Sequence, residues 1–231
     1  MRTLKGRKNY RENYNCSIFT KIYKNNDWGG EPNEFYSGPG SHHPLIHGYV
    51  QEVGDFIIKN QLKDIVEIGC GDFNIGEKVL KHLDSAGTDF TYIGYDVVKP
   101  LIRRNREMFG NERTKFICKD ASSGIIKNGD VLIIRQVLQH LNNRAIQQII
   151  KKFNNYRYII VSEHQLAEHY GNRIRPNIDQ VTSASIRLHM SSAIYLDKPP
   201  FNCNIIGRLY SIPEPAYGLE AAINTFIIKR K

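Results

Sequence analysis

The residues of this chain that could do chemistry stand at the ends of two apolar runs. The first run contains Glu67 and leads into the turn Gly69-Cys70-Gly71-Asp72, and the second ends at Asp96, 25 residues after Gly71. That distance leaves room for one helix and one strand. A Gly-rich turn lets the backbone approach a ligand, and a carboxylate ending the next strand binds ribose hydroxyls. The spacing therefore predicts a βαβ unit that binds a nucleoside.

The glycine spacing distinguishes between nucleotide cofactors. The dinucleotide pattern Gly-x-Gly-x-x-Gly needs a third glycine at position 74, where this chain has Asn74, and the next glycine is Gly76. There is also no Gly-Lys-Ser/Thr sequence of a P-loop. These absences disfavour cofactors held through a pyrophosphate or a triphosphate. What remains is an acidic residue before the turn and acidic residues, Asp96 and Asp120, ending the next two strands.

At this point residues 63–162 resemble the class I S-adenosylmethionine (SAM)-dependent methyltransferases. The resemblance implies that the glycine turn lies under the methionine part of SAM, that Asp96 holds both ribose hydroxyls, and that Asp120 with Ala121 meets the adenine amino group. One bidentate acceptor suits two vicinal hydroxyls. It implies S-adenosylhomocysteine (SAH) as the product, and as the cofactor-binding residues Glu67, Gly69, Cys70, Gly71, Asp96, Val97, Asp120, Ala121 and Gln136.

A closer resemblance covers nearly the whole chain. The motifs that carry it are Trp28-Gly29, Ser37-Gly38-Pro39-Gly40-Ser41, Cys70-Gly71-Asp72-Phe73-Asn74, Tyr92-Ile93-Gly94-Tyr95-Asp96, His140-Leu141 and Pro199-Pro200-Phe201-Asn202. They are similar to a subfamily of small bacterial and phage methyltransferases, some of which are associated with surface-polysaccharide modification. Its members often have Arg-Asp after the fourth strand, whereas this chain has Arg135-Gln136.

Strand and helix patterns alternate through the middle of the chain. We expect strands near 65–68, 90–95, 115–118, 131–134, 158–161, 203–212 and 222–228, and helices near 44–60, 75–83, 99–108 and 142–153. Strands separated by helices form a mostly parallel sheet covered on both faces. The predicted fold class is α/β, a Rossmann-like, doubly wound, mostly parallel sheet with an antiparallel C-terminal finish.

We expect one domain with an appendage. Residues 1–44 are predicted to form a long loop or arm that covers the site, because they are polar and Gly-rich with several apolar anchors. Residues 45–231 are predicted to form a single methyltransferase domain, in which 163–200 are a substrate-side insertion. Four scattered cysteines form no CxxC pair, so neither a metal site nor a disulfide framework is expected.

The rest of the active site is predicted at the ends of the fourth and fifth strands and in the front loop. A hydroxyl acceptor must lose a proton, and histidine, with a pKa of about 6.5, suits that task. His140 and His164 are therefore the candidate catalytic bases, and Glu163 could orient His164 as a pair. Alternatively, His140 is a helix-start residue that satisfies backbone groups, and Glu163 and His164 are a solvated loop pair. The candidate substrate-binding residues are Trp28, Tyr36, Ser41, His42, Arg135 and Glu163.

Composition leaves several functions open. The leading hypothesis is O-methylation of a sugar, a sugar phosphate or another small polar acceptor such as a glycan. The net charge of +9, with a basic arm between Arg2 and Arg11 and a basic tail from Lys229 to Lys231, keeps RNA or DNA as an alternative substrate. A non-catalytic SAM-binding module is the third possibility. With no signal sequence or apolar run of about 20 residues, we expect a cytoplasmic protein of undetermined oligomeric state.

Overall fold

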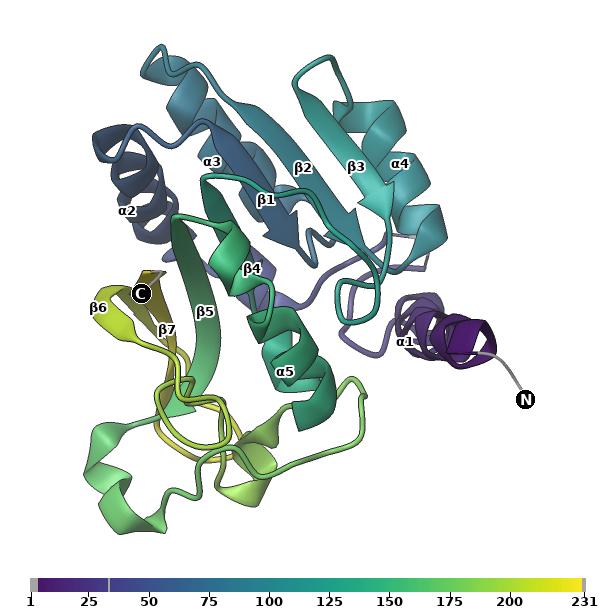
Figure 1. Ribbon diagram of the computed structural model, residues 1–231. Coiled ribbons are helices and arrows are strands. Elements are labelled where there is room, and N and C mark those ends of the chain that lie inside the picture. Colours follow the sequence, from purple (N-terminus) through teal and green to yellow (C-terminus); the bar gives the residue numbers. More distant parts are fainter. Residues whose placement is uncertain (1–3, 33, 230–231) are drawn as a thin grey trace.

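A seven-stranded sheet forms the centre of the molecule (Figure 1). The computed structural model describes residues 4–32 and 34–229, so Arg2 of the basic arm and Arg230 and Lys231 of the tail lie outside it. The strands are β1 (Asp64–Ile68), β2 (Thr91–Asp96), β3 (Thr114–Cys118), β4 (Val131–Arg135), β5 (Tyr158–Leu166), β6 (Ile205–Pro213) and β7 (Ala221–Lys229). Their order is β3-β2-β1-β4-β5-β7-β6.

The predicted fold class is confirmed. Strands β1 to β5 pair in parallel, and β7 and β6 add to β5 as an antiparallel finish. The chain leaves β1 for β2 on one side and reaches β4 on the other, so the strand order reverses between β1 and β4. In open parallel sheets the crevice at such a reversal, outside the carboxyl ends of the strands, is where ligands bind.

Helices cover both faces of the sheet (Figure 1). They are α2 (Ile46–Lys59), α3 (Asn74–Ser85), α4 (Lys99–Phe109) and α5 (Asn143–Ile150), whereas α1 (Leu4–Asn25) lies beside the ends of the strands. One core lies under α2 and α3 and contains Val53 and Leu83. A second core lies under α5 and contains Ile146. The central strands read as nearly continuous apolar runs because both of their faces are buried.

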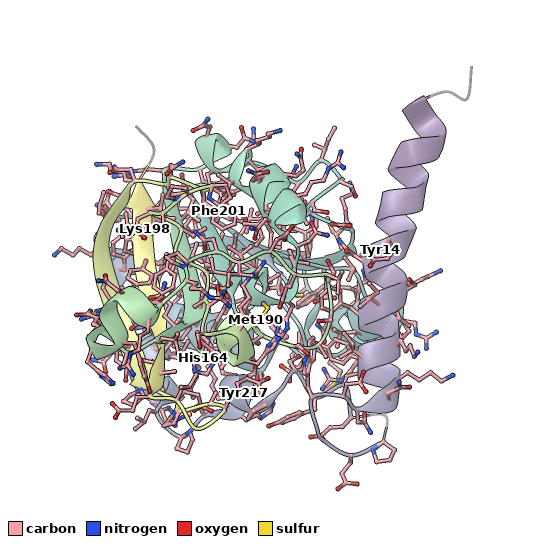
Figure 2. All side chains as sticks on the ribbon, turned by 90° about the horizontal axis from the view of Figure 1, so that it is seen from below. Tyr14, His164, Met190, Lys198, Phe201 and Tyr217 are labelled. Atoms are coloured by element: carbon pink, nitrogen blue, oxygen red, sulfur yellow. The ribbon has the colours of Figure 1, made fainter. Side chains whose placement is uncertain are left out.

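The N-terminal segment differs from the expected loop, because Leu4–Asn25 form helix α1. Its apolar residues Ile18, Phe19, Ile22 and Tyr23 recur with helical spacing, and the glycines that suggested a loop begin only at Gly29. Ile22 is buried against the body of the protein. Figure 2 shows α1 along one side of the molecule, with its N-terminal end projecting beyond it.

Strand β5 is longer than predicted and continues to Leu166. It is extended because β7 pairs with it along its whole length, from Tyr158 opposite Lys229 to Leu166 opposite Ala221. Residues 163–166 are therefore part of the sheet and not of an insertion. The segment that follows contains the 3₁₀ helices η4 (Glu168–Arg173) and η5 (Arg187–Met190), beside η1 (Pro39–His42), η2 (Leu138–His140) and η3 (Phe153–Asn155) elsewhere in the chain.

A buried arginine holds the segment after η4 against the sheet. Arg187 is 1% exposed, and its guanidinium donates hydrogen bonds to the carbonyl oxygens of Ile178, Leu138, Gln139 and Leu141. Five planar N–H donors allow one side chain to satisfy several carbonyl groups at once. Arg187 thereby ties η5 to η2. Among the described residues, no helix is both long enough and apolar enough to cross a membrane.

Candidate nucleoside-binding active site

A cavity of about 530 Å³ lies at the carboxyl ends of the parallel strands. Its size falls within the range of roughly 300–1,000 Å³ that small-molecule sites have. It opens where the strand order reverses between β1 and β4, as the fold predicts. Its wall includes every residue that we predicted to bind the cofactor, namely Glu67, Gly69, Cys70, Gly71, Asp96, Val97, Asp120, Ala121 and Gln136.

The glycine turn after β1 is closely covered. Gly69 and Gly71 have φ of 72° and 51°, a left-handed conformation that favours glycine. A Cβ atom on Gly69 would lie 2.3 Å from Val137 Cγ2, and one on Gly71 would lie 2.5 Å from Ser37 Oγ. The two glycines are therefore required both by the backbone and by the segments that pack over the turn.

Carboxylates gather around this turn. Burial raises the pKa of Glu67 to about 7, even though the Tyr92 hydroxyl donates a hydrogen bond to it at 2.5 Å. Burial also raises the pKa of Asp96, and Asp72 adds to both shifts by repulsion. Within the described part of the chain, neither Glu67 nor Asp96 forms an ion pair with a lysine or arginine. Arg135 nevertheless acts on Glu67 as a nearby positive charge, and Asp72 is paired with His42, so Asp96 is the carboxylate of this turn that has no charged partner among the described residues.

Asp96 is held in place by the backbone. Its two carboxylate oxygens accept hydrogen bonds from the N–H groups of Gly71, at 3.2 Å, and Val98, at 3.0 Å. A carboxylate offers about four lone-pair sites, so acceptor sites remain for a ligand. Asp96 lines the cavity with its orientation already fixed by the backbone.

Asp120, which follows β3, also lines the cavity and is bonded to helix α1. Its Oδ2 accepts a hydrogen bond from Asn15 Nδ2 at 2.9 Å, and its Oδ1 accepts one from the N–H of Ser122 at 2.7 Å. Asn15 is 6% exposed and lies 105 residues away in the sequence. Helix α1 therefore forms part of the wall at the position where an adenine amino group is expected.

Residues 37–41, in the segment after α1, cover the glycine turn and form part of the cavity wall. The N–H of Ser37 bonds to Asp72 Oδ2, the N–H of Asp72 bonds to Ser37 Oγ, and Tyr23 shares a 2.7 Å hydrogen bond with the same hydroxyl. Further along, Asn74 Nδ2 donates to the Ser41 carbonyl oxygen and Arg135 donates to that of Gly40. These bonds fasten residues 37–41 to the ends of both β1 and β4.

The two candidate bases, His140 and His164, both line the cavity, but they differ in how many of their ring nitrogens have a hydrogen-bond partner. His140 Nδ1 lies 3.3 Å from the Ser185 carbonyl oxygen, its Nε2 lies 3.4 Å from Gln139 Nε2, and its ring packs 5.1 Å from that of Trp28. Burial lowers the pKa of His140 to about 4. Both of its nitrogens therefore have partners, and it is neutral over the physiological range.

His164 has one nitrogen available. Its Nε2 lies 2.5 Å from the Glu214 carbonyl oxygen, which can only accept, so Nε2 carries the proton. Its Nδ1 consequently bears a lone pair, and no described residue donates a hydrogen bond to it. Burial lowers the pKa of His164, and the neighbouring Glu214 opposes that shift. His164 lines the cavity, and its geometry leaves one unprotonated ring nitrogen without a partner among the described residues.

No protein-family model matches this sequence, and no curated protein is significantly similar to it in sequence. Solved structures do resemble it. ChlM, the magnesium protoporphyrin IX methyltransferase of Synechocystis PCC 6803, solved with bound SAH, is 14% identical with a TM-score of 0.52, over 97% of this chain and 99% of that one. The methyltransferase domain of bacterial CtHen1-C is 13% identical with a TM-score of 0.53, over 80% of this chain and 98% of that one.

The protein has a methyltransferase fold. TehB from Haemophilus influenzae is also similar, at 14% identity and a TM-score of 0.52 over 82% of this chain. This chain spans only 64% of the TehB chain. The shared architecture agrees with the predicted resemblance to class I methyltransferases at the level of the fold, whereas these similarities do not show the link to polysaccharide-modifying or phage proteins.

The methyltransferase fold brings only some of the predicted substrate-binding residues to the cavity. Trp28, Ser41 and Arg135 line it. Tyr36 and His42 do not line it. Their rings stack on each other at 4.6 Å, and His42 Nε2 lies 3.1 Å from Oδ2 of Asp72, which does line the cavity. The pair therefore supports the glycine turn from behind the lining residue Asp72.

Glu163 also differs from its predicted role. Its two carboxylate oxygens accept hydrogen bonds from the N–H groups of Leu138 and Gln139, at 2.8 and 3.1 Å, and it is 2% exposed. Successive residues of a strand face opposite sides of the sheet, so Glu163 and His164 cannot form the oriented pair considered from the sequence. Glu163 instead supports the start of η2, and burial raises its pKa to about 8.

Sequence reasoning missed several residues of the wall. They share an origin in segments whose position only the fold reveals, and they include Asn15, Phe19, Tyr23, Ser37, Ser185, Glu214 and Tyr217. The helical spacing of Phe19 and Tyr23 was a usable signal for a helix that packs on the body. No local signal marked Glu214, which reaches the cavity because β6 lies next to β7.

Proposed function

We propose that this protein is a SAM-dependent methyltransferase. The observation that carries the proposal is the group of carboxylates at the glycine turn, Glu67, Asp72 and Asp96, none of which forms an ion pair with a lysine or arginine among the described residues. SAM carries a sulfonium and an ammonium group, and both positive charges are complementary to such a site. A dinucleotide would instead bring a negatively charged pyrophosphate to it. Electrostatic complementarity therefore favours SAM independently of the fold.

The residues present fit this cofactor. Asp96 offers free acceptor sites for the vicinal ribose hydroxyls, and Asp120 with Asn15 offers polar groups for adenine. Gly69, Cys70 and Gly71 give the methionine part a close backbone surface, and Glu67 lies beneath it. When bound, SAM supplies an electrophilic methyl group. The resemblance to solved structures with bound SAH, which concerns the fold, supports the same assignment.

We propose that the acceptor is a hydroxyl group of a small polar molecule, such as a sugar, a sugar phosphate or part of a glycan. The protein must hold the acceptor oxygen close to the methyl group and in line with the bond that breaks, and such positioning supplies much of a rate enhancement. His164 is the favoured base, because it lines the cavity and its Nδ1 has no partner among the described residues, while Nε2 is held by the Glu214 carbonyl oxygen. His140, with both nitrogens engaged, positions the wall beside Trp28.

The test is a calorimetric titration of the protein with SAH, with NAD in parallel. The wild type should bind SAH and not NAD. Asp96→Asn should weaken SAH binding by about 10- to 100-fold, because a hydrogen bond to a charged group contributes roughly 1.5–3 kcal/mol. Asp89→Asn, on the exposed surface beside Lys63, is the matched control and should bind as the wild type does.

Two results would contradict the proposal. A wild-type protein that does not bind SAH at millimolar concentration is not a SAM-dependent enzyme. Unchanged SAH affinity in Asp96→Asn would show that Asp96 does not bind the ribose hydroxyls. Turnover of a panel of sugars and nucleotide sugars in the presence of SAM then separates an enzyme from a non-catalytic binding module.

A further inference from the structure

Arg135 is a buried positive charge without a carboxylate partner. It is the last residue of β4, it is 8% exposed, and it lines the cavity. Of its five N–H donors, one bonds to Gln136 Oε1 and one to the Gly40 carbonyl oxygen, both at 2.8 Å. Among the described residues, no acceptor is found for its buried Nε and no carboxylate forms an ion pair with it.

The carboxylates that act most strongly on the charge of Arg135 already have other hydrogen-bond partners. Glu67, whose hydrogen bond comes from the Tyr92 hydroxyl, has its pKa raised to about 7. Glu163 is bonded to the backbone of η2, and Asp72 is paired with His42. Leaving a charge buried and unpaired is costly, so a ligand that compensates Arg135 gains in affinity.

The guanidinium is also held in one orientation. It lies over the ring of Tyr49, 5.1 Å from the ring centre, and its bonds to Gln136 and Gly40 fix its plane. A planar fork fixed in this way matches the two oxygens of a carboxylate or phosphate, which a lysine would not.

The position of Arg135 connects it with the proposed base. Arg135 pairs with Ser162 across the parallel strands, so its side chain lies on the same face as Ser162 and, two residues further along, His164. From strand geometry the Cα atoms of Arg135 and His164 are about 8 Å apart. A group bound to Arg135 therefore lies between the carboxylate cluster of the turn and His164.

We propose that Arg135 forms an oxyanion subsite, which binds a carboxylate or phosphate group of the ligands in this cavity. The inference rests on the proposed function, in which this cavity binds SAM and a methyl acceptor. Two sources offer the same chemistry, namely an anionic group on the acceptor and the methionyl carboxylate of the cofactor. The shared face with His164 favours the acceptor.

The experiment titrates wild-type protein, Arg135→Gln and Arg135→Lys with SAH and with 5′-methylthioadenosine, which lacks the amino-acid part. Inorganic phosphate and benzoate are then titrated into each protein saturated with SAH. Arg103→Gln, at an exposed position of α4, is the matched control for the loss of one charge.

If the oxyanion belongs to the acceptor, Arg135→Gln binds SAH within twofold of the wild type, and SAH-saturated wild type binds phosphate or benzoate at least tenfold more tightly than Arg135→Gln does. If it belongs to the cofactor, Arg135→Gln loses at least tenfold in SAH affinity but keeps its affinity for methylthioadenosine. Arg135→Lys keeps the positive charge and loses the planar pair of donors. It should therefore show a smaller loss of affinity for the same ligand, and it replaces Arg135→Gln as the test if Arg135→Gln does not fold.

The inference is overturned if Arg135→Gln and Arg103→Gln match the wild type in every titration. It is also overturned if Arg135→Gln loses SAH and methylthioadenosine equally, since Arg135 then only supports the segment around Gly40. Failure of the proposed function is a separate result, in which the wild type binds neither nucleoside. The titration of wild type and Arg135→Gln with phosphate and benzoate, without SAH, still tests the subsite in that case.

Discussion

At the scale of single residues, burial changes what each titratable group can do. Glu67 and Glu163 both have raised pKa values, yet one lines the cavity and the other binds the backbone of η2. His140 and His164 both have lowered pKa values, but only His164 keeps an unengaged nitrogen. Residue type and exposure alone therefore do not assign a role, and the hydrogen-bond partners decide it.

We expect His140 to contribute to acid unfolding. Its pKa of about 4 in the folded protein lies below the value of about 6.5 in an unfolded chain. Protonation therefore favours the unfolded state, so the contribution is complete above pH 6.5 and is lost as the pH falls toward 4. The loss should be about 2.5 kcal/mol at pH 4.5.

The measurement is the free energy of unfolding in urea at pH 7 and pH 4.5. His140→Gln should lose less stability between the two pH values than the wild type does. His47→Gln, at an exposed position of α2, should behave as the wild type. An equal pH dependence in the wild type and His140→Gln would show that His140 is accessible to water in solution.

At the scale of elements, the site is assembled from segments that meet only in the folded chain. Helix α1 supplies Asn15, Phe19 and Tyr23, and the segment that follows it covers the glycine turn. Trp28, the only tryptophan of the chain, packs against Phe19, Tyr23 and His140. An intrinsic fluorophore therefore stands at the junction of α1 and η2, in the wall of the cavity.

We predict that Asn15→Ala weakens SAH binding by about five- to tenfold, since a hydrogen bond contributes roughly 1 kcal/mol net. The substitution removes the 2.9 Å bond to Asp120 and loosens the adenine side of the cavity. SAH affinity can be followed through the fluorescence of Trp28. Ser17→Ala, on the same helix and bonded only to the Tyr14 carbonyl oxygen, is the control. Equal affinities in both variants would mean that α1 does not close on the cofactor.

At the scale of the whole molecule, the net charge of +9 is the argument for a nucleic-acid substrate. The glycine turn opposes it, because the carboxylates at that turn would repel a phosphate backbone laid over it. We therefore expect only non-specific RNA binding, with a Kd above about 1 μM at physiological salt and a steep salt dependence. Saturating SAH should change this affinity by less than twofold.

The prediction can be checked by fluorescence anisotropy with a labelled single-stranded RNA over a range of salt concentrations. Binding below micromolar Kd at physiological salt, or binding strengthened by SAH, would support an RNA methyltransferase instead. Methyl transfer to the RNA in the presence of SAM would establish it.

The sequence by itself determined the central sheet and several of the strand-end residues that line the cavity. Gly69, Gly71, Asp96 and Asp120 follow three successive strands, and parallel strands place their carboxyl ends at one edge, so neighbours along the sheet become neighbours in the site. The sequence predicts these residues because local spacing, together with the rule that parallel strands end at one edge of the sheet, is enough to bring them together.

Only the tertiary structure decided the rest. Whether Glu163 or His164 faces the cavity depends on β5 continuing past Val161, which β7 imposes by pairing along its whole length. Asn15 reaches Asp120 across 105 residues, and Arg135 is left without a carboxylate by the packing around it. Side-chain direction and long-range closure result from contacts between distant segments, so local pattern could not reveal them.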